Sequence, residues 1–209
     1  MTDILLIVFT ISLLYISIAH RLLTYVKILA LQGLILSGMA LIQLRGMNTV
    51  NLVVILLETV AFKTIALPLF LNYVITRNNI TREADPYLPN FASLLIITLI
   101  IAFTFVLSNV MPDLYLEKMF FIVVLSALLT GLYIILTRRK IITHVMGYLV
   151  IENGVFLLSF AIGEDIPMLV NLGILLDLFA SVFVLGIFVN KIVDVLKDVD
   201  IDALKNLKD

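Results

Sequence analysis

Long runs of apolar residues, separated by short clusters of charges and turn residues, dominate the pattern along this chain. A helix of about 20 residues crosses a hydrocarbon core of ~30 Å, so each run is long enough to be a membrane span. The pattern predicts seven spans, which cover approximately residues 4–19, 22–44, 50–75, 91–110, 115–137, 142–162 and 168–190. We expect the first run to be a span and not a signal peptide, because it has no basic start and no small-residue cleavage site after it.

Basic residues gather on one side of the predicted spans. Eleven of the 14 Lys and Arg residues fall in the tail or near the loops after spans one, three and five, whereas two lie on the opposite side and Lys63 lies inside a span. Because positive residues mark the cytoplasmic side of a membrane protein, the sequence predicts an N-terminus outside and a C-terminus in the cytoplasm.

The composition supports a membrane protein and excludes several classes of function. Of the 209 residues, 62% are hydrophobic and 14% are charged, whereas soluble domains have about 25% charged residues. The absence of Cys excludes disulfides and thiolate metal sites, and two His cannot form a histidine-rich metal cage. A net charge of −1 lacks the basic surface that nucleic acids need. Seven spans also leave no room for a soluble catalytic domain.

A short pattern occurs in both the third and the seventh span. In each, the sequence Val-Asn-Leu is followed about seven residues later by an acid, Glu58 in one and Asp177 in the other. Spans two and six share a weaker match, Gln32 followed by Gly and Asn153 followed by Gly. These matches indicate an internal repeat of three helices. The alternative is that short apolar sequences recur by chance in a Leu-rich chain.

The repeat predicts the organisation of an all-α integral membrane protein. Span four has no ionisable residue, so we expect it to be a connector that lets both repeats share one orientation. A charged, amphipathic tail follows, and its net charge of −2 favours contact with a partner subunit over contact with anionic lipid. The predicted units are the first repeat 1–76, the loop and connector 77–114, the second repeat 115–193 and the tail 194–209.

Four ionisable residues lie well inside predicted spans, namely Glu58, Lys63, Glu152 and Asp177. Each costs about 2.5 to 3.5 kcal/mol near the bilayer centre unless it pairs or faces water, so such residues are functional candidates. We expect the carboxyls of Glu152 and Asp177 at the same depth. Glu58 and Lys63 are five positions apart, about 140° around an α-helix, so we expect them to face different neighbours, one of them in the next subunit. A snorkelling pair that neutralises itself is the alternative.

Two further residues continue the helical face of Glu152 toward the cytoplasm. Tyr148 and His144 precede Glu152 at steps of four residues. An imidazole, a phenol and a carboxyl in one stripe predict a path for proton uptake from the cytoplasm to the midplane. The alternative is that His144 is an ordinary interfacial residue and Tyr148 an amphipathic anchor.

Three segments carry a resemblance to known families. HVMGYLVIENGVFLLSFA, residues 144–161, and MLVNLGILLDLFASVFVLGIFVNKI, residues 168–192, resemble the second and third helices of subunit K of respiratory complex I, each of which carries an embedded Glu. Glu152 and Asp177 take those two positions, although Asp is one methylene shorter than Glu. A third segment, LLETVAFKTIALPLFL, residues 56–71, and the doubled layout extend the resemblance to the whole chain. The whole chain is similar to component E of hydrogenase-4, which belongs to the group 4 membrane-bound hydrogenases and formate hydrogenlyases.

The resemblance implies a subunit without a catalytic centre or cofactor of its own, in the cytoplasmic membrane of a bacterium or archaeon. Its complex would be a redox-driven proton or sodium pump with antiporter-like and membrane-anchor subunits, and with nickel-iron and iron-sulfur centres in a peripheral module. Buried Glu, Lys and His form a midplane chain of ionisable groups in such complexes, and this subunit's share would be Glu58, Lys63, Glu152 and Asp177. Two alternatives are a subunit of a multi-subunit cation/proton antiporter and a purely structural spacer.

Overall fold

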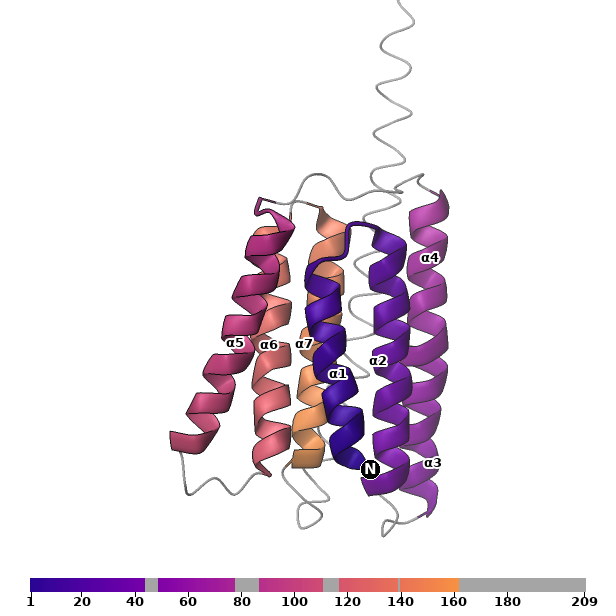
Figure 1. Ribbon diagram of the computed structural model, residues 1–209. Helices are drawn as coiled ribbons and strands as arrows, with labels where there is room; N and C mark the ends of the chain where they lie inside the picture. The colour runs from indigo at the N-terminus through magenta and orange to yellow at the C-terminus, as the bar shows by residue number, and fades with distance from the viewer. Residues whose placement is uncertain (44–48, 78–86, 111–116, 139, 162–209) are drawn as a thin grey trace, which may run out of the picture.

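All regular structure in the described part of the chain is helical. The computed structural model describes residues 1–43, 49–77, 87–110, 117–138 and 140–161. Figure 1 shows the helices of these ranges lying side by side in one bundle. They are α1 (Thr2–Ser17), α2 (Leu22–Gln43), α3 (Thr49–Leu57), η1 (Glu58–Ala66), α4 (Leu67–Arg77), α5 (Asn90–Val110), α6 (Lys118–Thr137) and α7 (Ile141–Ala161).

The helices follow six of the seven predicted spans to within a few residues. Five runs are long and apolar enough to cross a membrane, namely α2, the run Ile55–Thr76 through η1, α5, α6 and α7, whereas α1 is shorter at 16 residues. The predicted seventh span and the predicted tail lie outside the described residues. The third span differs from its prediction, because α3, η1 and α4 follow one another without a break and the nine residues of η1 form a π-helix.

Four helices form the centre of the bundle. α1 packs against α2 and α6, α2 packs against α7, and the contact between α6 and α7 is the most extensive. Two small residues bring the backbones of α6 and α7 together, since a Cβ added to Gly131 would lie 2.6 Å from the carbonyl oxygen of Gly147. α5 packs outside on α6 and α1, and η1 and α4 pack on α2 at the other edge (Figure 1).

The predicted connector, α5, buries Ser93, Thr104 and Ser108 against the bundle, whereas Thr98 and most of its large apolar side chains are on the outer side. The Thr104 hydroxyl lies 2.8 Å from that of Ser126 on α6, and the Tyr133 hydroxyl of α6 donates a hydrogen bond of 2.8 Å to Ser93. On the opposite face, large side chains such as Phe103 are more than half exposed. Such an apolar surface suits lipid tails or the helices of another membrane subunit.

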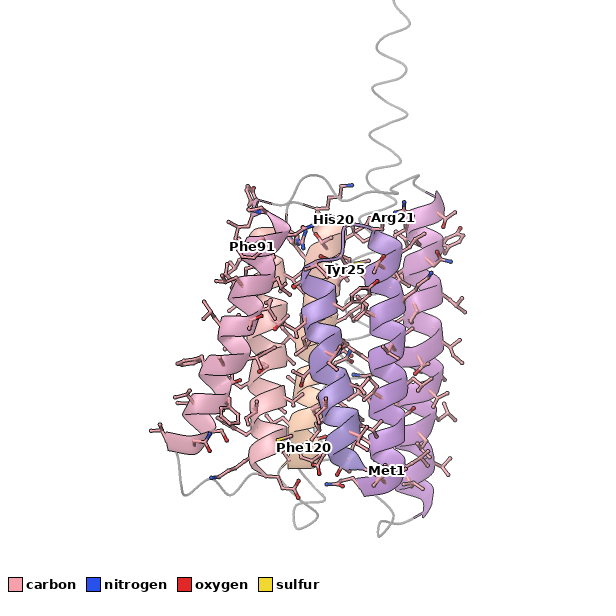
Figure 2. All side chains as sticks on the ribbon, viewed as in Figure 1. Met1, His20, Arg21, Tyr25, Phe91 and Phe120 are labelled. Carbon is pink, nitrogen blue, oxygen red and sulfur yellow. The ribbon has the colours of Figure 1, made fainter. Side chains whose placement is uncertain are left out.

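A buried arginine ties the bundle together at the end where the loops are rich in basic residues. His20 and Arg21 lie at this end, opposite Met1 (Figure 2). Arg138 is only 2% exposed, and its Nη2 donates a hydrogen bond of 2.8 Å to the backbone carbonyl of Ser17 at the end of α1. The last carbonyls of a helix lack intrahelical donors and carry partial negative charge. Arg138 therefore fastens the end of α1 to the connection between α6 and α7.

Candidate functional site

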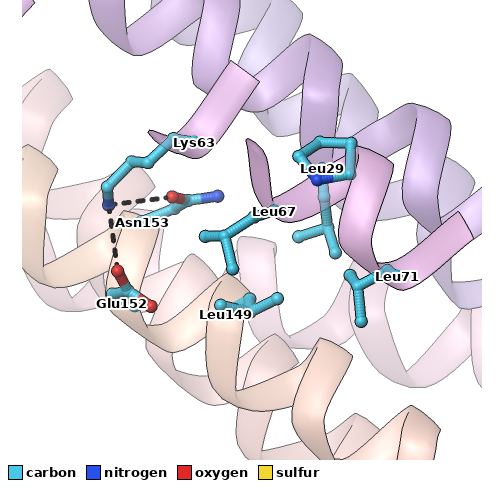
Figure 3. A pocket seen from close by; sticks show the side chains of 8 residues that line it. Leu29, Lys63, Leu67, Leu71, Leu149, Glu152 and Asn153 are labelled. Carbon is cyan, nitrogen blue, oxygen red and sulfur yellow. Dashed lines mark hydrogen bonds and ion pairs between the residues drawn. The ribbon is translucent and has the colours of Figure 1, made fainter. Parts of the chain in front are cut away.

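A buried ion pair joins two helices near their middles. Lys63 of η1 places its Nζ 3.5 Å from Oε1 of Glu152 on α7, and the two side chains are 3% and 4% exposed. Figure 3 shows the pair between the two helices, with the carboxylate and the ammonium pointing toward each other. Because each charge would be costly alone in the hydrocarbon core, pairing lowers the cost of keeping both there.

One face of α7 surrounds the ammonium of Lys63. The Nζ donates a hydrogen bond of 3.2 Å to Oδ1 of Asn153 and lies 4.9 Å from the centroid of the Phe156 ring. Phe156 is four positions after Glu152, so the ring and the carboxylate share one face of the helix. The ammonium thus meets a carboxylate, an amide oxygen and an aromatic face, all of which favour its positive charge.

A small cavity adjoins the ion pair. Its volume of about 10 Å³ is close to the minimum that one water molecule needs. Apolar side chains form most of the wall, and the polar groups of the pair and of Asn153 lie on one side of it (Figure 3). The lining residues are Leu29, Lys63, Leu67, Pro68, Leu71, Leu149, Glu152 and Asn153. Three polar side chains and this volume suit a single bridging water.

The backbone around Lys63 departs from α-helical geometry. The N–H of Leu67 bonds to the carbonyl of Phe62 five residues earlier, and Pro68 has no N–H to offer to the carbonyl of Lys63. A Cβ added to Gly33 of α2 would lie 3.0 Å from that same carbonyl oxygen, so only glycine lets α2 approach here. π-helical segments occur often at functional sites, and η1 holds the only Lys of the predicted site.

The structure brings together two of the four ionisable residues predicted to conduct ions. Lys63 and Glu152 form the pair, whereas Asp177 and the side chain of Glu58 lie outside the described residues. The expectation that Glu58 and Lys63 differ by 140° rested on α-helical spacing, which does not apply in η1, where backbone hydrogen bonds link residues five apart. Lys63 faces α7 of its own chain and does not point out of the bundle.

The two residues predicted for proton uptake lie on α7, between Glu152 and the end of the bundle that carries the basic loops. His144 is partly buried, and its Nε2 lies 2.6 Å from the backbone carbonyl oxygen of Arg138. A carbonyl only accepts, so Nε2 carries the hydrogen and Nδ1 faces elsewhere. Tyr148 is half-buried one turn closer to Glu152. A proton path through these side chains stays a prediction.

Sequence reasoning missed the site role of two amide side chains. Gln32 and Asn153 drew notice only as a match between repeats, yet both are buried and bonded to each other, Asn153 Nδ2 donating to Gln32 Oε1 at 3.0 Å. The signal was present in the chain, because a Gln or Asn in the middle of a membrane span is also a costly polar group. A search restricted to ionisable residues does not find it.

Comparisons with known proteins show which proteins the chain is similar to. Residues 119–209 match the family NADH-ubiquinone/plastoquinone oxidoreductase chain 4L. The whole chain is similar to an uncharacterized protein of Mycobacterium tuberculosis, Rv0085, with 28% identity over 191 residues that cover 88% of this chain and 85% of that protein. No solved structure matches the chain. The C-terminal part of this membrane protein, which contains Glu152, is thus a domain similar to complex I chain 4L.

Proposed function

We propose that the chain is a non-catalytic membrane subunit of a redox-driven proton or sodium pump of the complex I and group 4 hydrogenase superfamily. The observation that carries the proposal is the buried pair of Lys63 and Glu152 at 3.5 Å, whose carboxylate lies in the region similar to chain 4L. An intramembrane ion pair is a functional site by default, because neither charge is needed to hold apolar helices together.

The pair has the chemistry to pass a proton from one side chain to the other. Moving one proton from the ammonium of Lys63 to the carboxylate of Glu152 turns two buried charges into two neutral groups. In a medium of low dielectric constant, the cost of burying the charges and their mutual attraction are both large and nearly cancel. A change of charge on a neighbouring group can therefore shift the pair between its two states. A water molecule in the adjoining cavity would offer a bridge for the proton.

The remaining residues complete the proposed path. Glu58 and Asp177 are the further midplane groups, and His144 and Tyr148 are the route for uptake from the cytoplasm. In the proposed repeat, α1 corresponds to α6 and α2 corresponds to α7. Each of these helices packs against its counterpart, which supports two related units, 1–76 and 115–193, around a common axis.

We propose that other subunits of the complex hold its redox centres. Antiporter-like and membrane-anchor subunits would lie beside it in the cytoplasmic membrane, and the nickel-iron and iron-sulfur centres would belong to a peripheral module. The exposed apolar face of α5 offers one surface for such neighbours, because Leu99 and Phe103 are each nearly 60% exposed on it. We base the hydrogenase-type redox module on the resemblance of the sequence to component E of hydrogenase-4, whereas the family match is to a complex I chain.

Purification of the native complex tests the proposal. The chromosomal copy of the chain receives an affinity tag, the complex is extracted in mild detergent, and mass spectrometry identifies the subunits that remain bound. The proposal predicts hydrogenase-type or dehydrogenase-type redox subunits with antiporter-like membrane subunits. Antiporter subunits without any redox module would overturn it in favour of a cation/proton antiporter. A Glu152→Gln complex that assembles on a native gel and transports ions normally would leave only a structural spacer.

A further inference from the structure

A row of buried hydrogen bonds links the ion pair to the first helix of the bundle. Asn153, which accepts from Lys63, donates from Nδ2 to Oε1 of Gln32 at 3.0 Å. Gln32 donates from Nε2 to the hydroxyl of Ser12 at 2.8 Å, and that hydroxyl donates to the backbone carbonyl of Phe9 at 2.6 Å. The row crosses from η1 through α7 and α2 to α1, and all of its side chains are buried.

All the donors in this row point away from Lys63. An ammonium donates and never accepts, so Asn153 must turn its oxygen toward Lys63 and its NH₂ toward Gln32. Gln32 must then present its oxygen to Asn153 and its NH₂ to Ser12. The hydroxyl of Ser12 is left as the donor to a carbonyl of α1. The charge on Lys63 thus fixes one orientation of both amides, and the fixed amides in turn keep an acceptor in front of the ammonium.

We propose that Gln32 and Asn153 are positioning residues that hold the ammonium of Lys63 beside the carboxylate of Glu152. The inference rests on the proposed function of the pair. Neither amide titrates, so neither carries the proton itself. Without Gln32, the NH₂ of Asn153 loses its acceptor, so the side chain is no longer held in place and its oxygen can move away from the ammonium. Lys63 then withdraws from Glu152, which takes up a proton because a lone buried carboxylate is costly.

Carbodiimide labelling measures the effect on Glu152 directly. Dicyclohexylcarbodiimide modifies carboxyls that are neutral and lie in apolar surroundings, so it reports the neutral fraction of Glu152. Membranes that contain the full chain are labelled at neutral pH, and mass spectrometry quantifies the adduct on Glu152. We expect little labelling of the native chain. In Gln32→Met and in Asn153→Leu the labelled fraction rises by about tenfold, the factor that corresponds to about 1.4 kcal/mol.

Two controls separate positioning from general loosening of the bundle. Thr104→Val removes a buried hydrogen bond between α5 and α6 and leaves labelling of Glu152 at the native level. Exchanging the two amides, Gln32→Asn with Asn153→Gln, preserves both the amide contact and the combined side-chain length, so it returns labelling toward the native level. A rise in Thr104→Val equal to that in Gln32→Met, or no recovery in the exchanged variant, overturns the inference.

Lys63→Met distinguishes failure of this inference from failure of the proposed function. We expect it to raise labelling of Glu152 at least as much as Gln32→Met does. If Lys63→Met raises labelling and neither Gln32→Met nor Asn153→Leu does, the amides have no positioning role and the ion pair stands. If Lys63→Met itself leaves labelling unchanged, the pair does not control the carboxyl, and the proposed function and the inference fail together.

Discussion

The ion pair predicts a specific pattern of stability in a double-mutant cycle. Lys63→Met leaves the carboxyl of Glu152 buried without its cation, and Glu152→Gln leaves the ammonium without its anion. At 3.5 Å, Coulomb attraction at an effective dielectric constant of 20 amounts to about 5 kcal/mol, and removing one partner of a buried pair typically costs ~3 to 5 kcal/mol. Replacing both residues removes both charges, so the double variant should lose less than either single variant.

Reversible unfolding in lipid-detergent mixtures measures the four free energies of unfolding. We expect a coupling energy of at least ~2 kcal/mol, because the second substitution relieves the unpaired charge that the first one creates. Thr104→Val combined with Lys63→Met is the matched control, since Thr104 bonds to Ser126 and not to the pair, and its cost should add. If the costs of Lys63→Met and Glu152→Gln also add to within ~0.5 kcal/mol, the two side chains do not interact in the membrane and the site as described is refuted.

Three further substitutions probe the surroundings of the site. Gly33→Ala should lower the free energy of unfolding by about 1 to 3 kcal/mol, because the new Cβ would lie 2.9 Å from the backbone of Lys63. Gly38→Ala is the control, since its nearest contact would be at 3.6 Å. Equal effects of the two substitutions in a thermal unfolding assay would contradict this prediction. Arg138→Met should cost about 1.5 to 3 kcal/mol through the lost charge-assisted hydrogen bond to α1, measured by the same assay. His144→Phe should slow proton uptake into everted vesicles in a complex that still assembles on a native gel, and an unchanged uptake rate would exclude His144 from the path.

The limits of the helices could be predicted from sequence because each apolar run ends at residues that the hydrocarbon core rejects. α2 begins at Leu22, directly after His20 and Arg21, and α6 ends at Thr137, directly before Arg138. Burial of Arg138 could not be predicted, because it depends on the backbone carbonyl of Ser17, a group that every residue carries and that no sequence pattern marks.

The ion pair itself was only half predictable. The cost of a charge in the membrane singled out Lys63 and Glu152. Their 3.5 Å contact, however, joins segments far apart in the chain and depends on how η1 and α7 both pack on α2. The π geometry of η1 also changes which way Lys63 points; Pro68 follows η1 in the chain, and Gly33 packs closely against the backbone of Lys63. Neither residue alone predicts a π-helix, since both also occur in ordinary membrane α-helices.

In the proposed function, the pair of Lys63 and Glu152 carries ions during turnover of a redox-driven complex. Ions moved per electron, recorded together in everted membrane vesicles that contain either the native chain or Glu152→Gln, test it most directly. We expect Glu152→Gln to reduce ion movement several-fold while electron transfer by the peripheral module continues and the complex stays assembled on a native gel. An unchanged ratio of ions to electrons in a fully assembled Glu152→Gln complex would contradict it.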